Sequence, residues 1–241
     1  MRALLILGGL SEKVFLSIQQ RLKKESFDWL GAVDQGIYWA QKLGYTLDLA
    51  LGDLDSLHPL DRAEVLAHQV NIERYPAAKD DSDGALLLEG ALRAGATELL
   101  ILCAMGLNRP DHFLSLTQLL AKKQVDMASQ GRNLRIELYD GQSQVHYLLG
   151  PCQFDAQHKV QDPEHPEQAV VSIIPWSEEL QGLDYQGLAW PLEQACVSRG
   201  TSKTLSNYPL QANGHFRVQL AAGQALLCLC YEKTPERIIF E

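Results

Sequence analysis

Apolar and polar residues follow one repeated pattern over the first 140 residues: a short apolar run, a polar loop, and a segment with helical spacing. The apolar runs are nearly uniform rather than alternating, which is typical of strands buried on both faces of a sheet. They predict strands at 3–7, 29–33, 47–51, 99–104 and 134–138, and a shorter one at 71–75. Helices are predicted after Ser11, over 37–43 and 61–68, from about Asp83 to Gly95, and from about His112 to Lys123. This order predicts an open, mostly parallel, Rossmann-like α/β sheet, whose ligands bind outside the carboxyl ends of the strands.

The pattern changes near residue 140. Beyond it, short β-like runs are separated by turn residues, and no segment has convincing helical spacing. These runs are 145–149, 170–174, 216–220 and 225–231. We therefore expect two domains, an α/β domain over 1–140 and a smaller all-β sandwich or barrel over 141–241.

The composition narrows the classes of partner. The net charge of −9 argues against nucleic acid or an anionic membrane as the main partner, because both require a basic face. A nucleotide substrate remains compatible, since a bound metal ion can reverse the local charge. The five cysteines include no Cys-x-x-Cys pair, and no apolar run is long enough to span a membrane. The first apolar run ends at Gly8-Gly9 and favours a strand over a signal sequence, so a cytoplasmic protein is expected.

Four polar loops each follow a predicted strand, so their side chains should converge on one edge of the sheet. They contain Asp34; Asp53 and Asp55; Lys79, Asp80, Ser82 and Asp83; and Arg109, Asp111 and His112. Asp53 and Asp55 are two residues apart, so on extended chain both project to the same side. Carboxylates that bind Mg²⁺, beside cations that bind phosphate oxygens, are the components of phosphoryl-type transfer. The sequence contains no Walker loop and no Gly-x-Ser-x-Gly elbow.

Each of these residues also has a structural interpretation. The acidic residues after the strands are typical of turns, and Ser82 or Asp83 could cap a helix. Lys79 could be a solvated surface lysine, and Arg109 with Asp111 a structural ion pair. The repetition of such loops after successive strands favours a shared site over four unrelated structural roles.

Seven motifs occur in an order that resembles the thiamin pyrophosphokinase family. The α/β half contains the family's Asp-x-Gly, Gly-Asp-x-Asp-Ser, Lys-Asp-x-Thr/Ser-Asp and Gly-x-x-Arg-x-Asp-His patterns, at 34–36, 52–56, 79–83 and 106–112. The second half contains similar segments at Ser172 to Pro175, Gly187 to Leu192, and Ser206-Asn207. The chain departs from the family pattern at Leu107-Asn108, at Pro110 and at Leu116.

The resemblance implies an enzyme that transfers the diphosphoryl group of ATP to thiamin and releases AMP. It implies a homodimer whose thiamin sites lie between the α/β domain of one subunit and the β domain of the other. Mg²⁺ would be held by Asp34, Asp53, Asp55 and Asp83, and the nucleotide would contact Lys79, Asp80, Ser82, Arg109 and His112. Asp111 would lie near the reacting hydroxyl or the metal ion, and thiamin would contact Trp190, Ser206 and Asn207. Two alternatives on the same fold are a non-catalytic nucleotide- or thiamin-binding regulator and a Mg²⁺-dependent phosphohydrolase. For Trp190, packing in a core or interface is the structural alternative.

Overall fold

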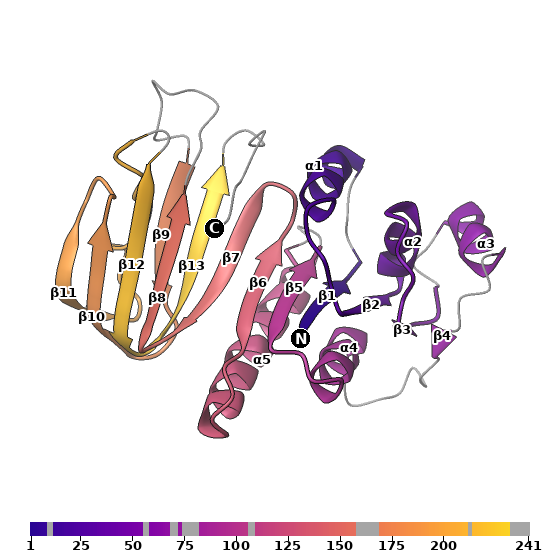
Figure 1. The fold of residues 1–241 in the computed structure, drawn as a ribbon, viewed down its shortest axis with the longest axis horizontal. Helices are drawn as coiled ribbons and strands as arrows, with labels where there is room; N and C mark the ends of the chain where they lie inside the picture. The colour runs from indigo at the N-terminus through magenta and orange to yellow at the C-terminus, as the bar shows by residue number, and fades with distance from the viewer. Residues whose placement is uncertain are drawn as a thin grey trace. The chain divides into compact units, whose positions relative to one another are not determined.

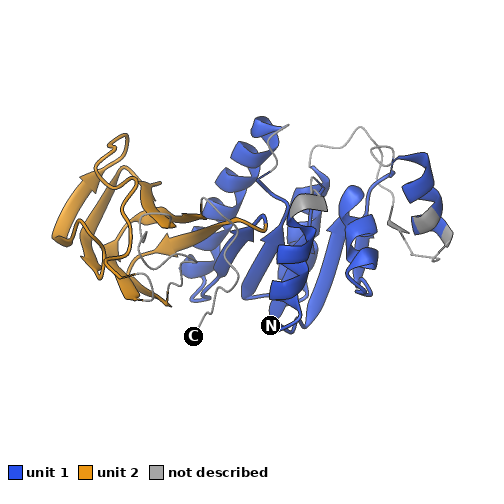
Figure 2. Ribbon diagram, turned by 90° about the horizontal axis from the view of Figure 1, so that it is seen from above, with its two compact units in different colours: residues 1–140 blue, residues 141–241 orange. Residues whose placement is uncertain are grey.

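The structure is a computed structural model that describes residues 1–8, 12–54, 58–67, 72–73, 82–105, 109–157, 169–211 and 214–231. The chain divides into two compact units, residues 1–140 and 141–241, which Figure 2 colours separately. Each unit has its own buried core. No helix among the described residues is long and apolar enough to cross a membrane.

The strands of unit 1 are all parallel, as the uniformly apolar runs predict. In sequence order they are β1 (Arg2–Ile6), β2 (Trp29–Val33), β3 (Leu49–Leu51), β4 (Ile72–Glu73), β5 (Glu98–Leu102) and β6 (Arg135–Tyr139). Their order across the sheet is β4-β3-β2-β1-β5-β6. The chain therefore builds outward from β1 in one direction and then from β5 in the other. In open α/β sheets, ligands bind at the carboxyl ends of strands beside such a switch.

Helices cover both faces of this sheet (Figure 1). They are α1 (Glu12–Leu22), α2 (Gln35–Lys42), α3 (Pro59–Ala67), α4 (Asp83–Arg93) and α5 (Pro110–Ser129). The first three bury one face of the sheet, through residues such as Ile18, Ile37 and Val65. Helix α4 packs closely on β2 and β3, where Gly31 and Gly90 leave room for the neighbouring leucine side chains.

Two predicted boundaries in unit 1 are wrong for identifiable reasons. Strand β3 begins at Leu49 rather than at 47, because Asp48 bonds to Leu30 through its carboxylate as well as its N–H, in place of a regular ladder. Helix α5 continues to Ser129 rather than ending near 123. Its polar Gln124 is buried and donates a hydrogen bond to the Leu134 carbonyl, so a polar residue continues the inward face of the helix.

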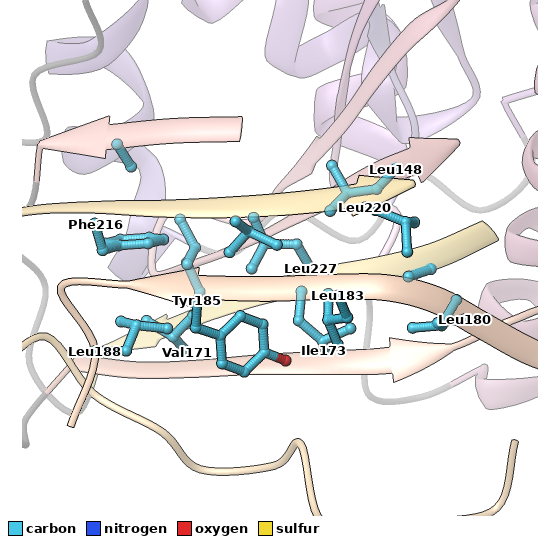
Figure 3. Close-up of a cluster of buried hydrophobic side chains, with 14 of the residues drawn as sticks. Leu148, Val171, Ile173, Leu180, Leu183, Tyr185, Leu188, Phe216, Leu220 and Leu227 are labelled. Carbon is cyan, nitrogen blue, oxygen red and sulfur yellow. The ribbon is translucent and has the colours of Figure 1, made fainter. Parts of the chain in front are cut away.

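The strands of unit 2 pair antiparallel in two sets, in the orders β7-β13-β9 and β11-β10-β12-β8. Its strands are β7 (Ser143–Leu149), β8 (Cys152–Gln157), β9 (Ala169–Pro175), β10 (Glu179–Gln186), β11 (Leu192–Ser198), β12 (His215–Ala222) and β13 (Gln224–Tyr231). Side chains from both sheets form one buried cluster, part of which Figure 3 shows. The predicted β-sandwich is confirmed, and the described part of unit 2 contains no helix. Three of its strands, β8, β10 and β11, are absent from the sequence-based prediction.

Candidate functional site at the carboxyl edge of the parallel sheet

Asp34 lies directly after β2 and is held against the end of β3. Its N–H donates to the Leu51 carbonyl at 3.0 Å. Its backbone has a φ of 47°, which is uncommon for a residue with a side chain, and its carboxylate does not cap helix α2. Carboxylate oxygen Oδ1 lies 2.1 Å from the point that a Cβ atom on Gly52 would occupy. Only glycine at position 52 therefore leaves this carboxylate its place beside the end of β3.

Asp53 follows Gly52 and is exposed. The next residue, Leu54, is 1% exposed and packs into the core covered by α1 to α3, although its φ is 62°. Because Leu54 is buried, it fixes the loop to the core, and Asp53 beside it remains exposed after the end of β3. Asp55, the second carboxylate of this predicted pair, lies outside the described residues.

Asp83 begins helix α4 at the same edge. Of the two predicted capping residues, Ser82 is the N-cap, because its Oγ accepts a hydrogen bond from the Ala85 N–H at 3.2 Å. A Cβ atom on Gly84 would lie 3.9 Å from the Leu7 side chain, so the first turn of α4 lies beside the end of β1. Helix α2 also begins there, since a Cβ atom on Gly36 would lie 2.1 Å from the Ile6 carbonyl oxygen. Two helix N-termini, which favour negative charge, thus meet the sheet at its switch point.

Arg109, Asp111 and His112 form an exposed group at the start of α5. Arg109 donates two hydrogen bonds to the Asp111 carboxylate, at 3.0 and 2.8 Å, and also contacts His112 Nε2. The hydrogen bond and charge of Arg109 lower the pKa of Asp111 to about 2. The predicted ion pair is therefore present, but all three side chains are more than half exposed, so its net stabilisation is small. Pro110 stands at the first helical position, where a missing N–H is harmless, so this family departure suits the helix.

Asp140 is a carboxylate at this edge that the sequence analysis did not select. It directly follows β6, the neighbour of β5. Burial, together with the charge of Asp140, raises the pKa of the Cys103 thiol well above its usual range. The signal was available in the sequence, because Asp140 follows a predicted strand as Asp34 and Asp53 do.

The described carboxylates do not by themselves form a metal centre. Asp34, Asp53 and Asp83 lie at the carboxyl edge, but the part of the chain described here has no group of three or more His, Cys, Asp or Glu side chains arranged to hold a metal ion. Lys79, Asp80 and Asp55 lie outside the described residues. The donor chemistry nevertheless fits Mg²⁺, because carboxylate oxygens are its preferred protein ligands.

Unit 2 brings together all three residues predicted to contact thiamin. Trp190 is 57% exposed, and its ring packs against that of Tyr208 in a T-shaped arrangement at a centroid distance of 5.3 Å. Ser206 is exposed and has a φ of 59°, whereas Asn207 is only 3% exposed. The Asn207 amide bonds to the main chain of Trp190 and Tyr208. Trp190 is therefore not a core tryptophan of unit 2, and Asn207 is a buried brace beside it.

Unit 1 is a parallel α/β unit with carboxylates at the switch-point edge of its sheet. Unit 2 is an antiparallel β-sandwich that exposes a tryptophan. Together they define a class of two-domain proteins with an acidic binding edge on the α/β domain. Comparison with known families identifies the family within this class. The model for "Thiamin pyrophosphokinase, catalytic domain" matches residues 20–129, and that for "Thiamin pyrophosphokinase, vitamin B1 binding domain" matches residues 157–223. The chain belongs to the thiamin pyrophosphokinase family, which is a family of enzymes.

Individual relatives agree with this assignment. The chain is 28% identical over 188 residues to the thiamine pyrophosphokinase of Bacillus subtilis (strain 168), covering 78% of this chain and 81% of that protein. The fold is similar to the crystal structure of thiamine pyrophosphokinase from Bacillus subtilis, with a TM-score of 0.76, 23% identity, and coverage of 96% of this chain and 100% of that one. It is also similar to thiamin pyrophosphokinase from Geobacillus thermodenitrificans, with a TM-score of 0.74, 22% identity, and coverage of 98% and 100%.

Proposed function

We propose that this chain catalyses the known reaction of its family, the transfer of the diphosphoryl group of ATP to the hydroxyl of thiamin, giving thiamin diphosphate and AMP. The observation that carries the proposal is the meeting of carboxylates and helix N-termini at the switch-point edge of the sheet. Phosphoryl-type transfer depends mainly on positioning and charge neutralisation, and an edge of this kind supports both.

Mg²⁺ would be held by Asp34, Asp53 and Asp83 together with Asp55. When bound, the ion would neutralise charge on the phosphate oxygens of the nucleotide. The chain's own contribution is the arrangement of the donors. Gly52 admits the Asp34 carboxylate to the end of β3, and buried Leu54 keeps Asp53 at the surface of the loop.

The triphosphate would be bound by Lys79 and Arg109, with His112, Asp80 and Ser82 beside it. The N-terminus of α4 would add its dipole, which favours a phosphate oxygen. Arg109 can exchange its exposed partner for a phosphate at little cost, because exposed ion pairs are weak.

Asp111 would accept the proton of the thiamin hydroxyl. While Arg109 pairs with it, its pKa of about 2 makes it a poor base near neutral pH. We propose that Arg109 leaves Asp111 for the nucleotide, so that the carboxylate becomes more basic only after ATP binds.

Thiamin would stack on the exposed indole of Trp190, since a flat cation is attracted to an aromatic face. Ser206 lies on the same segment as Asn207 and would face the ligand.

We propose a homodimer in which the Trp190 of one subunit completes the acidic edge of the other. Sedimentation of the full chain tests the dimer. The five cysteines are all free, which supports a reducing compartment such as the cytoplasm.

The deciding experiment incubates the full chain with Mg²⁺ and ATP, with and without thiamin, and measures AMP and thiamin diphosphate together. Equal amounts of both products, formed only with thiamin, are expected. AMP released without thiamin would instead identify a phosphohydrolase, and binding of both ligands without AMP would identify a regulator.

The variant Asp53→Asn should lower kcat by at least ~100-fold, the scale of lost electrostatic stabilisation at a reacting centre. Asp126→Asn is the matched control, because it removes the same charge from an exposed ion pair with Lys122 on α5. Near-normal turnover in Asp53→Asn, with an unchanged circular dichroism spectrum, would refute the metal assignment.

A further inference from the structure

Asn207 is embedded between two chain segments of unit 2. Its main chain pairs with β9 in both directions, since Val171 N–H donates to the Asn207 carbonyl at 2.7 Å and Asn207 N–H donates to the Val171 carbonyl at 3.0 Å. Its side-chain amide instead bonds to the main chain of residues 190 and 208. The residue thus connects a strand of the sandwich to the segment that carries the exposed tryptophan.

The amide of Asn207 satisfies both main-chain polar groups of Trp190. Its Oδ1 accepts from the Trp190 N–H at 3.1 Å, and its Nδ2 donates to the Trp190 carbonyl at 2.8 Å. Oδ1 also accepts from the Tyr208 N–H at 2.9 Å. Oδ1 therefore has no lone pair left for a ligand. Only the second N–H of Nδ2 remains, and Asn207 is only 3% exposed.

Other contacts fix the same segment without touching Trp190. The Ser206 N–H donates to Ser172 Oγ at 3.0 Å, which holds Ser206 at its positive φ. Thr204 Oγ1 donates to the Ile173 carbonyl at 2.6 Å and is 2% exposed. Ala189 N–H bonds to the Tyr208 carbonyl at 2.9 Å. Of the side chains named in this segment, only the Asn207 amide bonds to the main chain of residue 190 itself.

An exposed tryptophan needs such a brace. Trp190 is more than half exposed and its ring stands nearly perpendicular to the ring of Tyr208, so ring packing constrains the side chain weakly. The direction in which the indole leaves the chain is then set by the main chain at residue 190. That main chain is bonded to a single side chain at both its donor and its acceptor.

We propose that Asn207 is a positioning residue, which fixes the main chain of Trp190 and acts on the substrate only through the indole. This inference rests on the proposed function, in which Trp190 stacks on thiamin. It differs from the expectation that Asn207 contacts thiamin directly, and the two roles make opposite predictions in a double-mutant cycle.

The experiment measures KM and kcat for Asn207→Ala, Trp190→Ala and the double variant. Asn207→Ala alone should raise KM for thiamin about tenfold, the effect of losing hydrogen bonds that orient the contact, with KM for ATP unchanged. In the Trp190→Ala background, Asn207→Ala should change kcat/KM for thiamin less than twofold. Equal effects of Asn207→Ala in both backgrounds would show direct contact and overturn the proposal.

Thr204→Val is the matched control, since it removes another buried side-chain bond to a carbonyl from the same segment. It should lower stability and leave KM for thiamin unchanged. A rise equal to that of Asn207→Ala would mean that any loosening of the segment suffices, which also overturns the proposal.

A fluorescence measurement separates this inference from the proposed function. Subtracting the emission of Trp190→Phe isolates Trp190 from the other three tryptophans. Asn207→Ala should lower the anisotropy of this component and increase its quenching by acrylamide, whereas Thr204→Val should not. If the wild type forms no thiamin diphosphate, the proposed function fails, and the anisotropy alone decides the positioning role. An unchanged Trp190 signal in Asn207→Ala refutes that role whatever the activity.

Discussion

Gly52→Ala perturbs the acidic edge without removing any carboxylate. The new methyl group would lie 2.1 Å from Asp34 Oδ1 and 3.1 Å from the Asp34 nitrogen. Real Cβ atoms essentially never approach within 3.0 Å, so the carboxylate oxygen must move by about 0.9 Å. The φ of 125° at residue 52 also suits only glycine, which adds backbone strain of roughly 1–3 kcal/mol.

The chain offers a control with the same strain and no clash. Gly95 has a φ of 101°, and a Cβ atom there would meet nothing within 4 Å. Gly95→Ala should therefore show the backbone cost alone. Gly52→Ala should lose more stability in urea, and the excess should shrink in an Asp34→Ala background, where the displaced oxygen is absent.

Activity is the sharper measurement. A misplacement near 1 Å at a reacting centre can lower turnover by about 100-fold, so kcat for thiamin diphosphate formation should fall by that order in Gly52→Ala. Gly95→Ala should keep kcat within twofold of the wild type. If the two variants had equal kcat, with both folds intact, the Asp34 carboxylate would have no role at the reacting centre.

Two further predictions concern groups that the structure places in unusual surroundings. The Tyr185 hydroxyl is buried with no hydrogen-bond partner among the described residues (Figure 3), so Tyr185→Phe should raise the free energy of unfolding by roughly 1 kcal/mol in urea. Tyr139→Phe should lower it by a similar amount, because that hydroxyl bonds to Ser17; equal losses in both would contradict the argument. Arg109→Gln should return the pKa of Asp111 from about 2 toward 3.8, so that NMR at pH 3 finds the carboxyl ionised in the wild type and mostly protonated in the variant. The lowered pKa stabilises the fold above about pH 3.8 and this effect is lost as the pH falls toward 2, so the stabilities of the two proteins should converge there; an unchanged pKa in the variant would refute the assigned cause.

The parallel sheet of unit 1 was predictable because its strands are buried on both faces and read as unbroken apolar runs. The acidic edge was predictable in outline for the same reason, since it follows from where those runs end. The contact between Asp34 and Gly52 was not predictable from a pattern, because it depends on two loops that are 18 positions apart and meet only through β2–β3 pairing. Both residues lie in loops that the sequence pattern selects as candidate sites, but the pattern does not predict that they contact each other.

Two of the three strands missed in unit 2, β10 and β11, break the alternating period. In β10, the inward residues Leu180 and Leu183 are three positions apart, because the ladder shifts register around Gly182. In β11, Gln194 has a φ of 46° and is held by the Asp184 carboxylate through its N–H and its side chain. Both irregularities are fixed by a neighbouring strand, so a local pattern cannot contain them. Strand β8 does alternate between more and less exposed residues, so its pattern is one that a sequence can contain.

The strained backbone of the described residues gathers at the two proposed binding places. Of five non-glycine residues with positive φ, three follow the carboxyl ends of β2, β3 and β5, and a fourth is Ser206 beside the brace of Trp190. At least three of the four are held by a named contact: Asp34 by the Leu51 carbonyl, Cys103 by the Tyr139 carbonyl, and Ser206 by Ser172. Such conformations persist only where the surroundings determine them, and they concentrate where geometry serves a ligand. Local propensity therefore fails at the same positions where function is proposed, because tertiary contacts set the backbone there. Gly52→Ala tests one of these positions directly, since the new methyl group would displace the carboxylate of Asp34.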